Sequence, residues 1–258
     1  MGMMIEQRLA SSDPEVRRVA VLALAELGEE ENEPLLVGAL ADLDPTVRLE
    51  AALALEACES FEAVSGLVAR LDDPAEAVRS AAARSLAELK DPETAAWLLP
   101  ALVHASDAAR APLLRALREL RAEGAAAPAL GLLDDPSPEV RQEAVSVLAY
   151  LRHRRALGPI AELAARDPNE DVRRTAVGAL VYGDGERIAG VLTEAMRDPS
   201  WRVREEAATA LGKVQADGRA GVPVDALSDD YWQVRVRAAH SLGRTRDPSA
   251  PWPRWSPR

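Results

Sequence analysis

The feature that most constrains the fold is a motif that recurs along the chain at a nearly constant spacing. The stretch from Asp198 to Gly212 reads D-P-S-W-R-V-R-E-E-A-A-T-A-L-G, and imperfect copies of it fill most of the 258 residues. When the copies are aligned on the Arg of the Val-Arg pair, eight arginines lie 31 residues apart, with one interval of 32. A bias in composition alone would not keep arginine in register, so the chain is a repeat protein. The aligned residues are Arg17, Arg48, Arg79, Arg110, Arg141, Arg173, Arg204 and Arg235.

The two ends of each motif predict the two ends of a helix. An Asp-Pro pair opens most copies of the motif. Such a pair is typical of a helix start, because aspartate can cap free amide groups and proline already has a helical φ. We therefore expect helices to start at Asp13-Pro14, Asp44-Pro45, Asp73-Pro74, Asp135-Pro136, Asp167-Pro168 and Asp198-Pro199. Glycine favours the left-handed conformation that often ends a helix. We expect the ends at Gly28, Gly183, Gly212 and Gly243.

The interior of the motif and the segment between motifs predict a helix pair in each period. Val203, Ala207, Ala210 and Leu211 recur at steps of three and four, which places them along one packed stripe of a helix. A second apolar segment separates successive motifs, so each period holds two antiparallel helices of about 10 to 15 residues. Prolines near the start of the first helix should bend it or lie in its first turn. These prolines are Pro34, Pro128, Pro159 and Pro223.

The motif resembles the HEAT-like repeats of the phycobilisome-lyase type, with the pattern D-P-x-x-x-V-R-x-x-A-x-x-A-L-G. The resemblance implies an all-α fold, an α-solenoid (superhelix) of eight HEAT-like antiparallel helix pairs. It also implies that the Val-Arg helices line the concave side and that Asp and Arg form a ladder between neighbouring repeats, so we call the aligned arginines the ladder arginines. The fourth repeat departs from the pattern, with Ala109 for Val and Pro112 in the first turns.

The repeats define the expected domain organisation. Residues 1–246 form one solenoid, with repeats at about 1–28, 29–59, 60–90, 91–121, 122–152, 153–184, 185–215 and 216–246. Residues 247–258 form a tail whose four prolines exclude another helix. Trp252 and Trp255 in this tail could cap the last repeat, belong to a proline-rich docking segment, or reflect an altered end of the chain. Capping is the preferred interpretation, because terminal repeats need a protected outer face.

Composition and charge limit the classes of function. An aromatic content of 3% is too low for a β-sandwich or β-barrel core. The net charge is −11, and residues 1–130 carry 12 positive and 23 negative side chains against 19 of each in residues 131–258. A negative field repels phosphate, so nucleic-acid binding is disfavoured. No apolar segment is long enough for a bilayer and no secretory leader is recognised, which predicts a cytoplasmic location without a membrane partner.

The sequence contains no recognisable catalytic or metal-binding pattern. The three histidines, His104, His153 and His240, are far apart, and the single Cys58 adds no ligand spacing. Nucleophile-elbow and phosphate-loop motifs are absent, and paired aspartates such as Asp72-Asp73 precede helices, where capping explains them. We therefore expect no catalytic residue, no metal and no cofactor, and a protein that is not an enzyme.

The candidate site is a strip of side chains on the Val-Arg helices of the second half of the chain. Helical geometry and the orientation implied by the resemblance place the positions three and two before, and one, two, five and nine after, each ladder arginine on the concave side. Four of the nine aromatic residues fall there, and exposed Trp, Tyr and Arg dominate binding energies in interfaces. The candidate binding residues are Trp201, Arg202, Glu205, Thr209, Lys213, Trp232, Gln233, Arg237, His240, Arg244, Tyr150 and Tyr182.

The favoured functional prediction is a scaffold that binds a partner protein or peptide in its concave groove. The alternative for the tryptophans is that Trp201 and Trp232 only cover the joints between repeats. Two other classes stay open. One is a bilin lyase-like subunit that acts on a tetrapyrrole-carrying protein, which the resemblance implies. The other is weak nucleic-acid binding through Arg202, Lys213, Arg237 and Arg244. The sequence leaves the oligomeric state open.

Overall fold

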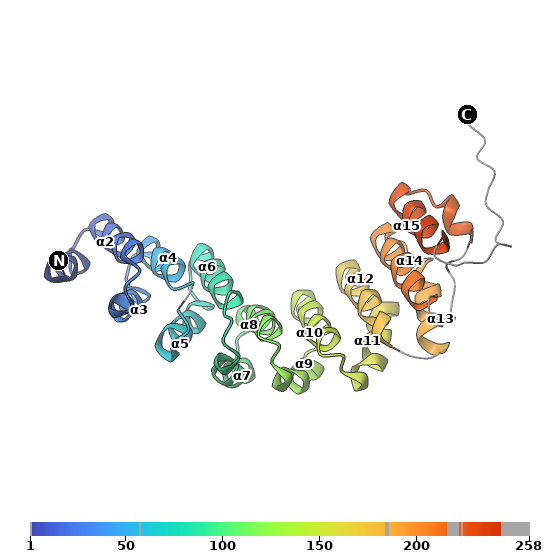
Figure 1. The fold of residues 1–258 in the computed structure, drawn as a ribbon, viewed down its shortest axis with the longest axis horizontal. Helices are drawn as coiled ribbons and strands as arrows, with labels where there is room; N and C mark the ends of the chain where they lie inside the picture. The colour runs from blue at the N-terminus through green and yellow to red at the C-terminus, as the bar shows by residue number, and fades with distance from the viewer. Residues whose placement is uncertain (1, 57, 184–185, 216–221, 223, 244–258) are drawn as a thin grey trace, which may run out of the picture. The chain divides into compact units, whose positions relative to one another are not determined.

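A computed structural model describes residues 2–56, 58–183, 186–215, 222 and 224–243 (Figure 1). Contacts divide the chain into two compact units, Met1–His153 and Arg154–Arg258, and each is described by itself. Within the described residues, all regular structure is helical and no strand occurs. The prediction of an all-α helical-repeat fold is therefore confirmed. No helix of the described part is both long and apolar enough to cross a bilayer. The tail 247–258 and Arg244 lie outside the described residues.

The unit Met1–His153 is a stack of helix pairs (Figure 1). The Val-Arg helices α2, α4, α6, α8 and α10 pack side by side in one row, and α3, α5, α7 and α9 form a second row against them. Short 3-10 turns precede some helices of the second row. The bounds are α1 (Gly2–Leu9), α2 (Pro14–Leu27), η1 (Glu30–Asn32), α3 (Glu33–Ala39), α4 (Pro45–Ala54), α5 (Phe61–Arg70), α6 (Glu76–Ala87), η2 (Pro92–Thr94), α7 (Ala95–Val103), α8 (Asp107–Glu119), η3 (Glu123–Ala125), α9 (Ala126–Gly131) and α10 (Pro138–Tyr150).

The unit Arg154–Arg258 repeats this arrangement, with α12, α14 and α15 as successive Val-Arg helices. The eighth repeat was expected to have an α-helix before its Val-Arg helix. In the described part of that segment, residues 224–228 form the short 3-10 helix η6, which packs against α15. The bounds are η4 (Arg154–Ala156), α11 (Leu157–Arg166), α12 (Glu170–Ala179), η5 (Leu180–Tyr182), α13 (Glu186–Ala195), α14 (Trp201–Gln215), η6 (Val224–Ser228) and α15 (Trp232–Gly243).

Some helices of the second row are shorter than expected, although α5 has the predicted 10 residues. α3 has 7 residues and α9 has 6, against the predicted 10 to 15. Pro34, Pro128 and Pro159 all lie in the first turn of their helices, where a backbone N–H has no acceptor within the helix and its absence in proline costs nothing. Pro223 lies outside the described residues. In the fourth repeat, α8 continues through Pro112 as one helix.

The prediction that every Asp-Pro pair starts a helix is right for two pairs and wrong for four. Asp13 and Asp44 are N-caps, with proline as the first helical residue. The other pairs lie before the N-cap, and their helices begin at Glu76, Pro138, Glu170 and Trp201. In these four turns the aspartate accepts the backbone N–H two residues later, as in Asp73 with Ala75 at 3.0 Å, and this turn ends where the helix begins.

The predicted helix ends are right at Gly28, Gly183 and Gly243 and wrong at Gly212. Among the glycines that the structure describes, only Gly28 has the left-handed conformation, with φ of +60° at the end of α2. Gly183 follows η5 in an extended conformation, and Gly243 is the last residue of α15. Gly212 lies inside α14, because it serves packing instead: a Cβ there would lie 2.2 Å from Ser241 Oγ of α15. Left-handed backbone also occurs at two arginines, Arg121 (φ 56°) and Arg152 (φ 49°), just after α8 and α10.

Ladder arginines join neighbouring repeats within each unit through a recurring contact. Arg48 donates from Nε and Nη2 to the two carboxylate oxygens of Asp73, at 2.7 and 2.8 Å. Its Nη1 donates to the backbone carbonyls of Asp42 and Leu43, so one guanidinium ties a turn of its own repeat to the next repeat. The same ion pair, which we call a rung, forms in Arg17–Asp42, Arg110–Asp135, Arg173–Asp198 and Arg204–Asp229.

Candidate functional site

Three aromatic residues lie where α14 and α15 begin, in the unit Arg154–Arg258, and two of their rings stack. Trp201 is the first residue of α14, Trp232 is the first residue of α15, and Tyr231 precedes it. The rings of Trp201 and Tyr231 stack with centroids 5.6 Å apart and an interplanar angle of 14°. Trp201 is half-buried by this contact, whereas Tyr231 is 45% and Trp232 is 61% exposed. We call these three residues the aromatic cluster.

The Arg204–Asp229 rung supports the Tyr231 ring of the aromatic cluster. Arg204 donates to both oxygens of Asp229 at 2.7 and 3.0 Å, and its guanidinium carbon lies 5.6 Å from the centre of the Tyr231 ring. Asp229 also accepts the backbone N–H of Tyr231 at 2.9 Å. Hydrogen bonds from Arg204 hold the pKa of Asp229 below its ordinary value, because they favour the charged carboxylate. The ring of Tyr231 therefore lies against a hydrogen-bonded ion pair.

Arginines and glutamates surround the cluster and pair between neighbouring helices. The guanidinium of Arg202 lies 5.7 Å from the Trp201 ring centre and 3.6 Å from Glu170 of α12. Arg237 of α15 donates to Glu205 of α14 at 3.2 Å. Both arginine side chains are about half exposed, so each can still offer donors to a bound molecule.

The remaining predicted site residues differ in how much they offer to a partner. Lys213 and His240 are exposed. Thr209 uses its hydroxyl to donate to the backbone carbonyl of Glu205 at 3.0 Å, and the Gln233 side-chain oxygen is buried without a hydrogen-bond partner among the described residues. Tyr182 of η5 is 55% exposed in the same unit.

Two predicted residues are not among the described residues of this unit. Tyr150 belongs to the unit Met1–His153, where the guanidinium of Arg121 lies 5.9 Å from its ring centre, so it is described apart from the aromatic cluster. Arg244 lies outside the described residues.

Sequence reasoning missed Tyr231. It lies four residues before a ladder arginine, where the helix cap is Asp, Ala, Ser or Asn in every other repeat. A large aromatic residue in that column of small residues is the signal that could have identified it. The residues in this column are Asp13, Asp44, Ala75, Ser106, Ser137, Asn169, Ser200 and Tyr231.

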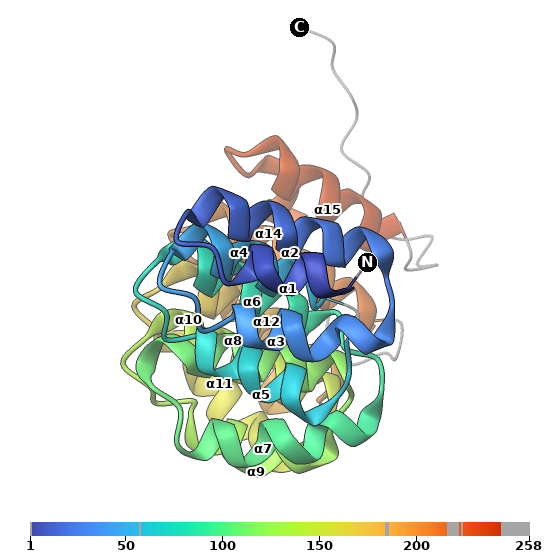
Figure 2. The same ribbon diagram turned by 90° about the vertical axis from the view of Figure 1, so that its left-hand side faces the viewer.

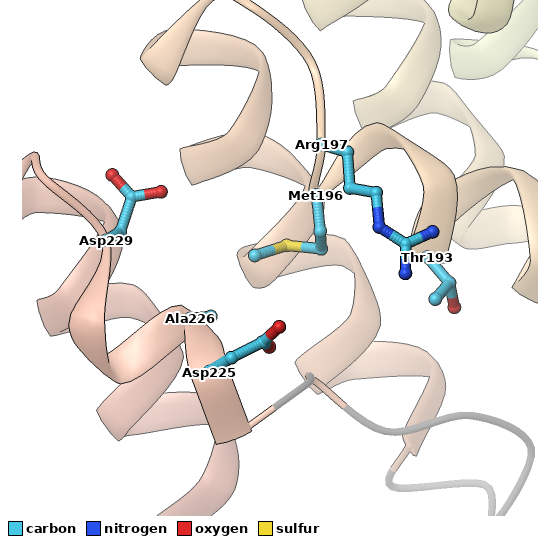
Figure 3. A pocket seen from close by; sticks show the side chains of 6 residues that line it. All are labelled: Thr193, Met196, Arg197, Asp225, Ala226 and Asp229. Carbon is cyan, nitrogen blue, oxygen red and sulfur yellow. The ribbon is translucent and has the colours of Figure 1, made fainter.

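A cavity of about 140 Å³ lies between α13 and η6, and Asp229 is one of the residues that line it (Figure 3). Figure 3 shows Met196 in the space between the two elements, with Thr193 and Arg197 on the α13 side and Asp225 on the η6 side. Two of its three charged lining residues already have partners, because Arg197 pairs with Glu194 at 3.0 Å and Asp229 pairs with Arg204. The described residues also contain no group of three His, Cys, Asp or Glu side chains that could hold a metal ion.

Comparisons with known proteins address the fold. The family model described as HEAT repeats matches residues 3–76, 64–135, 127–188, 164–223 and 188–251. The X-ray structure of YibA from E. coli is similar, with 19% identity, 95% of this chain and 93% of that chain covered, and a TM-score of 0.61. An engineered protein is similar at 21% identity over 93% of this chain and 77% of that chain, with a TM-score of 0.53. At these identities the likeness shows the fold alone.

The complex of CpcE and CpcF of phycocyanin lyase from Nostoc sp. PCC7120 is similar at 22% identity, covering 95% of this chain and 94% of that chain, with a TM-score of 0.44. That score is too low to support an argument about bilin chemistry. A comparison with curated proteins gave no match. The HEAT-repeat match covers nearly all of the sequence, and the ladder contacts recur in both units. The chain belongs to the HEAT repeat family.

Proposed function

We propose that this HEAT-repeat scaffold binds a partner protein or peptide on the exposed face of α14 and α15, centred on the aromatic cluster. Tryptophan, tyrosine and arginine supply most of the binding energy in protein interfaces, and all three types are exposed here. The proposed contacts are Trp201, Arg202, Glu205, Thr209, Lys213, Tyr231, Trp232, Gln233, Arg237 and His240, with Tyr182 as a further aromatic contact.

The observation that carries the proposal is the combination of exposure and support at Tyr231, with the exposed Trp232 next to it in sequence. Isolated exposed aromatic rings are common on protein surfaces and need no functional explanation. Tyr231, however, stacks on Trp201 and lies against Arg204, which is itself bound to Asp229. A ring that is already fixed loses little conformational entropy when a partner covers it. The cluster is therefore both apolar and preorganised, as a binding surface requires.

The proposal can be tested with peptides selected from a random displayed library on the immobilised full chain. Trp232→Ala removes the most exposed ring of the cluster, and Trp201→Ala with Trp232→Ala removes two. We expect the selected peptides to lose at least about tenfold in affinity for Trp232→Ala, because hot-spot truncations cost about 2 kcal/mol or more. Fluorescence anisotropy with labelled peptides measures the change.

Phe61→Ala is the matched control. Phe61 is 53% exposed and also contacts another aromatic ring, that of Trp97, but it belongs to the unit Met1–His153. Peptides that bind Trp232→Ala and the wild type equally, with both variants folded by circular dichroism, would remove the proposal. Peptides that lose affinity for Phe61→Ala instead would place binding elsewhere.

The alternatives predicted from the sequence stay predictions. Absorbance after mixing with a bilin tests the lyase-like reading, and a gel shift at low salt tests nucleic-acid binding. Arg202 and Arg237, two of the cations invoked for nucleic acid, already pair with Glu170 and Glu205. Neighbouring carboxylates offset their attraction for phosphate, so the geometry favours a protein or peptide.

A further inference from the structure

The first Val-Arg helix exposes a row of apolar side chains that the later repeats bury. Val16 directly precedes a ladder arginine and is 37% exposed. The valines at the same position in α4 and α6, Val47 and Val78, are 0% exposed. Leu27, ten residues after the ladder arginine, is 42% exposed, whereas Leu89 at the same position is 1% exposed. The difference is therefore one of environment and not of residue type.

The buried positions show which direction this face points. Ser85, six residues after its ladder arginine, donates from Oγ to the carbonyl of Ala52 on the preceding Val-Arg helix, at 2.8 Å. The equivalent Ser241 donates to Ala208 of α14 at the same distance. Position six therefore faces the preceding helix of the row. At 100° per residue, the positions one before, two after and ten after the ladder arginine lie within about 40° of position six around the helix axis, so they face the same way.

In α2 this face consists of Val16, Val19, Ala23 and Leu27, which we call the α2 end face. Val19 is 48% exposed, the largest value in the set. Figure 2 shows α1 and α2 nearest the viewer at this end of the unit, and α1 packs against α2 without covering the face. An exposed apolar row of this kind is typical of a docking surface.

The ladder contacts offer no ion pair to a neighbouring repeat of the same type at this face. A neighbouring repeat of the same type would present its ladder arginine to the residue six before Arg17. That position holds aspartate in the rungs, as in Asp42 and Asp73, but it is Ser11 here. The Ser11 hydroxyl already accepts the backbone N–H of Asp13 at 3.2 Å. The α2 end face therefore offers apolar contact without a carboxylate for a rung.

The charges beside the face define the chemistry of the partner. Glu15 and Glu26 flank Val19 on the helix surface, and both are exposed. Arg18, the nearest cation on α2, pairs with Glu15 at 3.1 Å and with Glu50 at 3.2 Å. A second copy of the chain would bring the same glutamates against these, and like charges oppose such a contact. An apolar stripe flanked by lysine or arginine complements both features.

We propose that the α2 end face binds a basic amphipathic helix of a partner protein, with its apolar stripe on Val16, Val19 and Leu27 and its cations beside Glu15 and Glu26. This mode is helix-to-helix packing through anchors spaced at i, i+3, i+4 and i+7. It does not depend on the aromatic cluster, which belongs to the other unit.

The test uses a fluorescein-labelled synthetic helix of leucine and lysine with leucines at that spacing, titrated with the full chain. We expect Val19→Glu to weaken binding at least about tenfold, because a carboxylate is then forced against leucine. Val236→Glu is the matched control, since Val236 is an exposed valine of α15 at 41%. It adds the same charge elsewhere, and binding should be unchanged. Equal affinity of both variants would show only non-specific attraction to an acidic protein and would overturn the proposal.

A charge reversal supports the test without touching the apolar residues. Glu15→Lys with Glu26→Lys should weaken the leucine–lysine helix and strengthen a leucine–glutamate helix of the same pattern. A variant that binds both helices as the wild type does would contradict the assigned partner chemistry. Light scattering over a concentration series addresses the other occupant: a dimer of the wild type that Val19→Glu abolishes would assign the face to a second copy and overturn the proposal.

Discussion

The joint between α4 and α6 contains a rung, whereas the joint between α6 and α8 does not. In the first, the carboxylate of Asp73 is fully buried and receives two hydrogen bonds from Arg48. In the second, His104 occupies the position of the aspartate, and Arg79 has no carboxylate partner among the described residues. Arg79 still donates to the backbone carbonyls of Asp73 and Pro74.

Both joints nevertheless pack helix against helix. Val78 and Ala109, at the same position before their ladder arginines, are buried to 0% and 4% exposure. In the second joint, Ser106 at the start of α8 donates instead to Asp72. Apolar burial therefore holds the stack together, and the rung adds to it. The comparison separates the contribution of the ion pair from that of packing.

The largest expected effect comes from the same substitution in both joints. Arg48→Met leaves the Asp73 carboxylate buried with only the backbone N–H of Ala75 and a longer contact to Arg70 at 3.3 Å, so we expect a loss of about 3 kcal/mol of unfolding free energy. Arg79→Met removes only hydrogen bonds to carbonyls and should cost about 1 kcal/mol. Urea denaturation of both variants measures the difference. Equal losses would mean that the rung contributes nothing beyond the carbonyl contacts.

The second prediction concerns pH. Hydrogen bonds from Arg48 lower the pKa of Asp73, so the folded state favours the charged carboxylate. The resulting stability is fully present above the ordinary aspartate pKa of about 3.9 and is lost as the pH falls through the lowered pKa of the folded state. The stability difference between wild type and Asp73→Asn should stay constant from neutral pH to about 5 and shrink below about 4. A difference that grows on acidification would contradict this assignment.

Ser106→Ala tests the contact that replaces the rung. Ser106 accepts the backbone N–H of Ala109 at 3.2 Å and donates to Asp72, so its removal should cost about 1 kcal/mol. Ser137 is a matched control, because it stands at the same position before α10 but makes no side-chain capping bond. Ser137→Ala should change the unfolding free energy by less than about 0.5 kcal/mol. Thermal melts followed by circular dichroism rank the two variants.

The smallest effect is a gain. His104→Asp places a carboxylate opposite Arg79 and should restore the rung, with a stabilisation of about 0.5 to 1 kcal/mol at neutral pH. The gain should disappear in the background of Arg79→Met. A gain that persists in that background would falsify the rung as its cause.

The period of the motif was sufficient to predict the all-helical fold, because a stripe of apolar residues at constant spacing has few ways to be buried. The helix ends were less predictable. Asp73 and Asp198 look like helix caps in sequence but form turns before the cap, since their carboxylates also receive an arginine from another repeat. Gly212 looks like a helix end but provides room for Ser241. Both cases depend on a neighbour that lies distant in the sequence.

The candidate site was predictable in part for a similar reason. The helical positions identified Trp201 and Trp232, but Tyr231 lies at a capping position that a list of helix faces leaves out. The stacking of Tyr231 on Trp201 and its contact with Arg204 arise only when two repeats meet. Neither contact can be read from a single repeat.

The construction of the rung bears on how such a chain can grow. Each repeat of the common type supplies an arginine to the repeat after it and an aspartate to the repeat before it. A duplicated copy inserted between two others could therefore form an ion pair with both neighbours. The copy that carries His104 can give its arginine, Arg110, but can receive none. Lengthening by tandem duplication would therefore be tolerated at most junctions. At the junction before α8, the arginine of an inserted copy would find His104 in place of the aspartate and would form no rung.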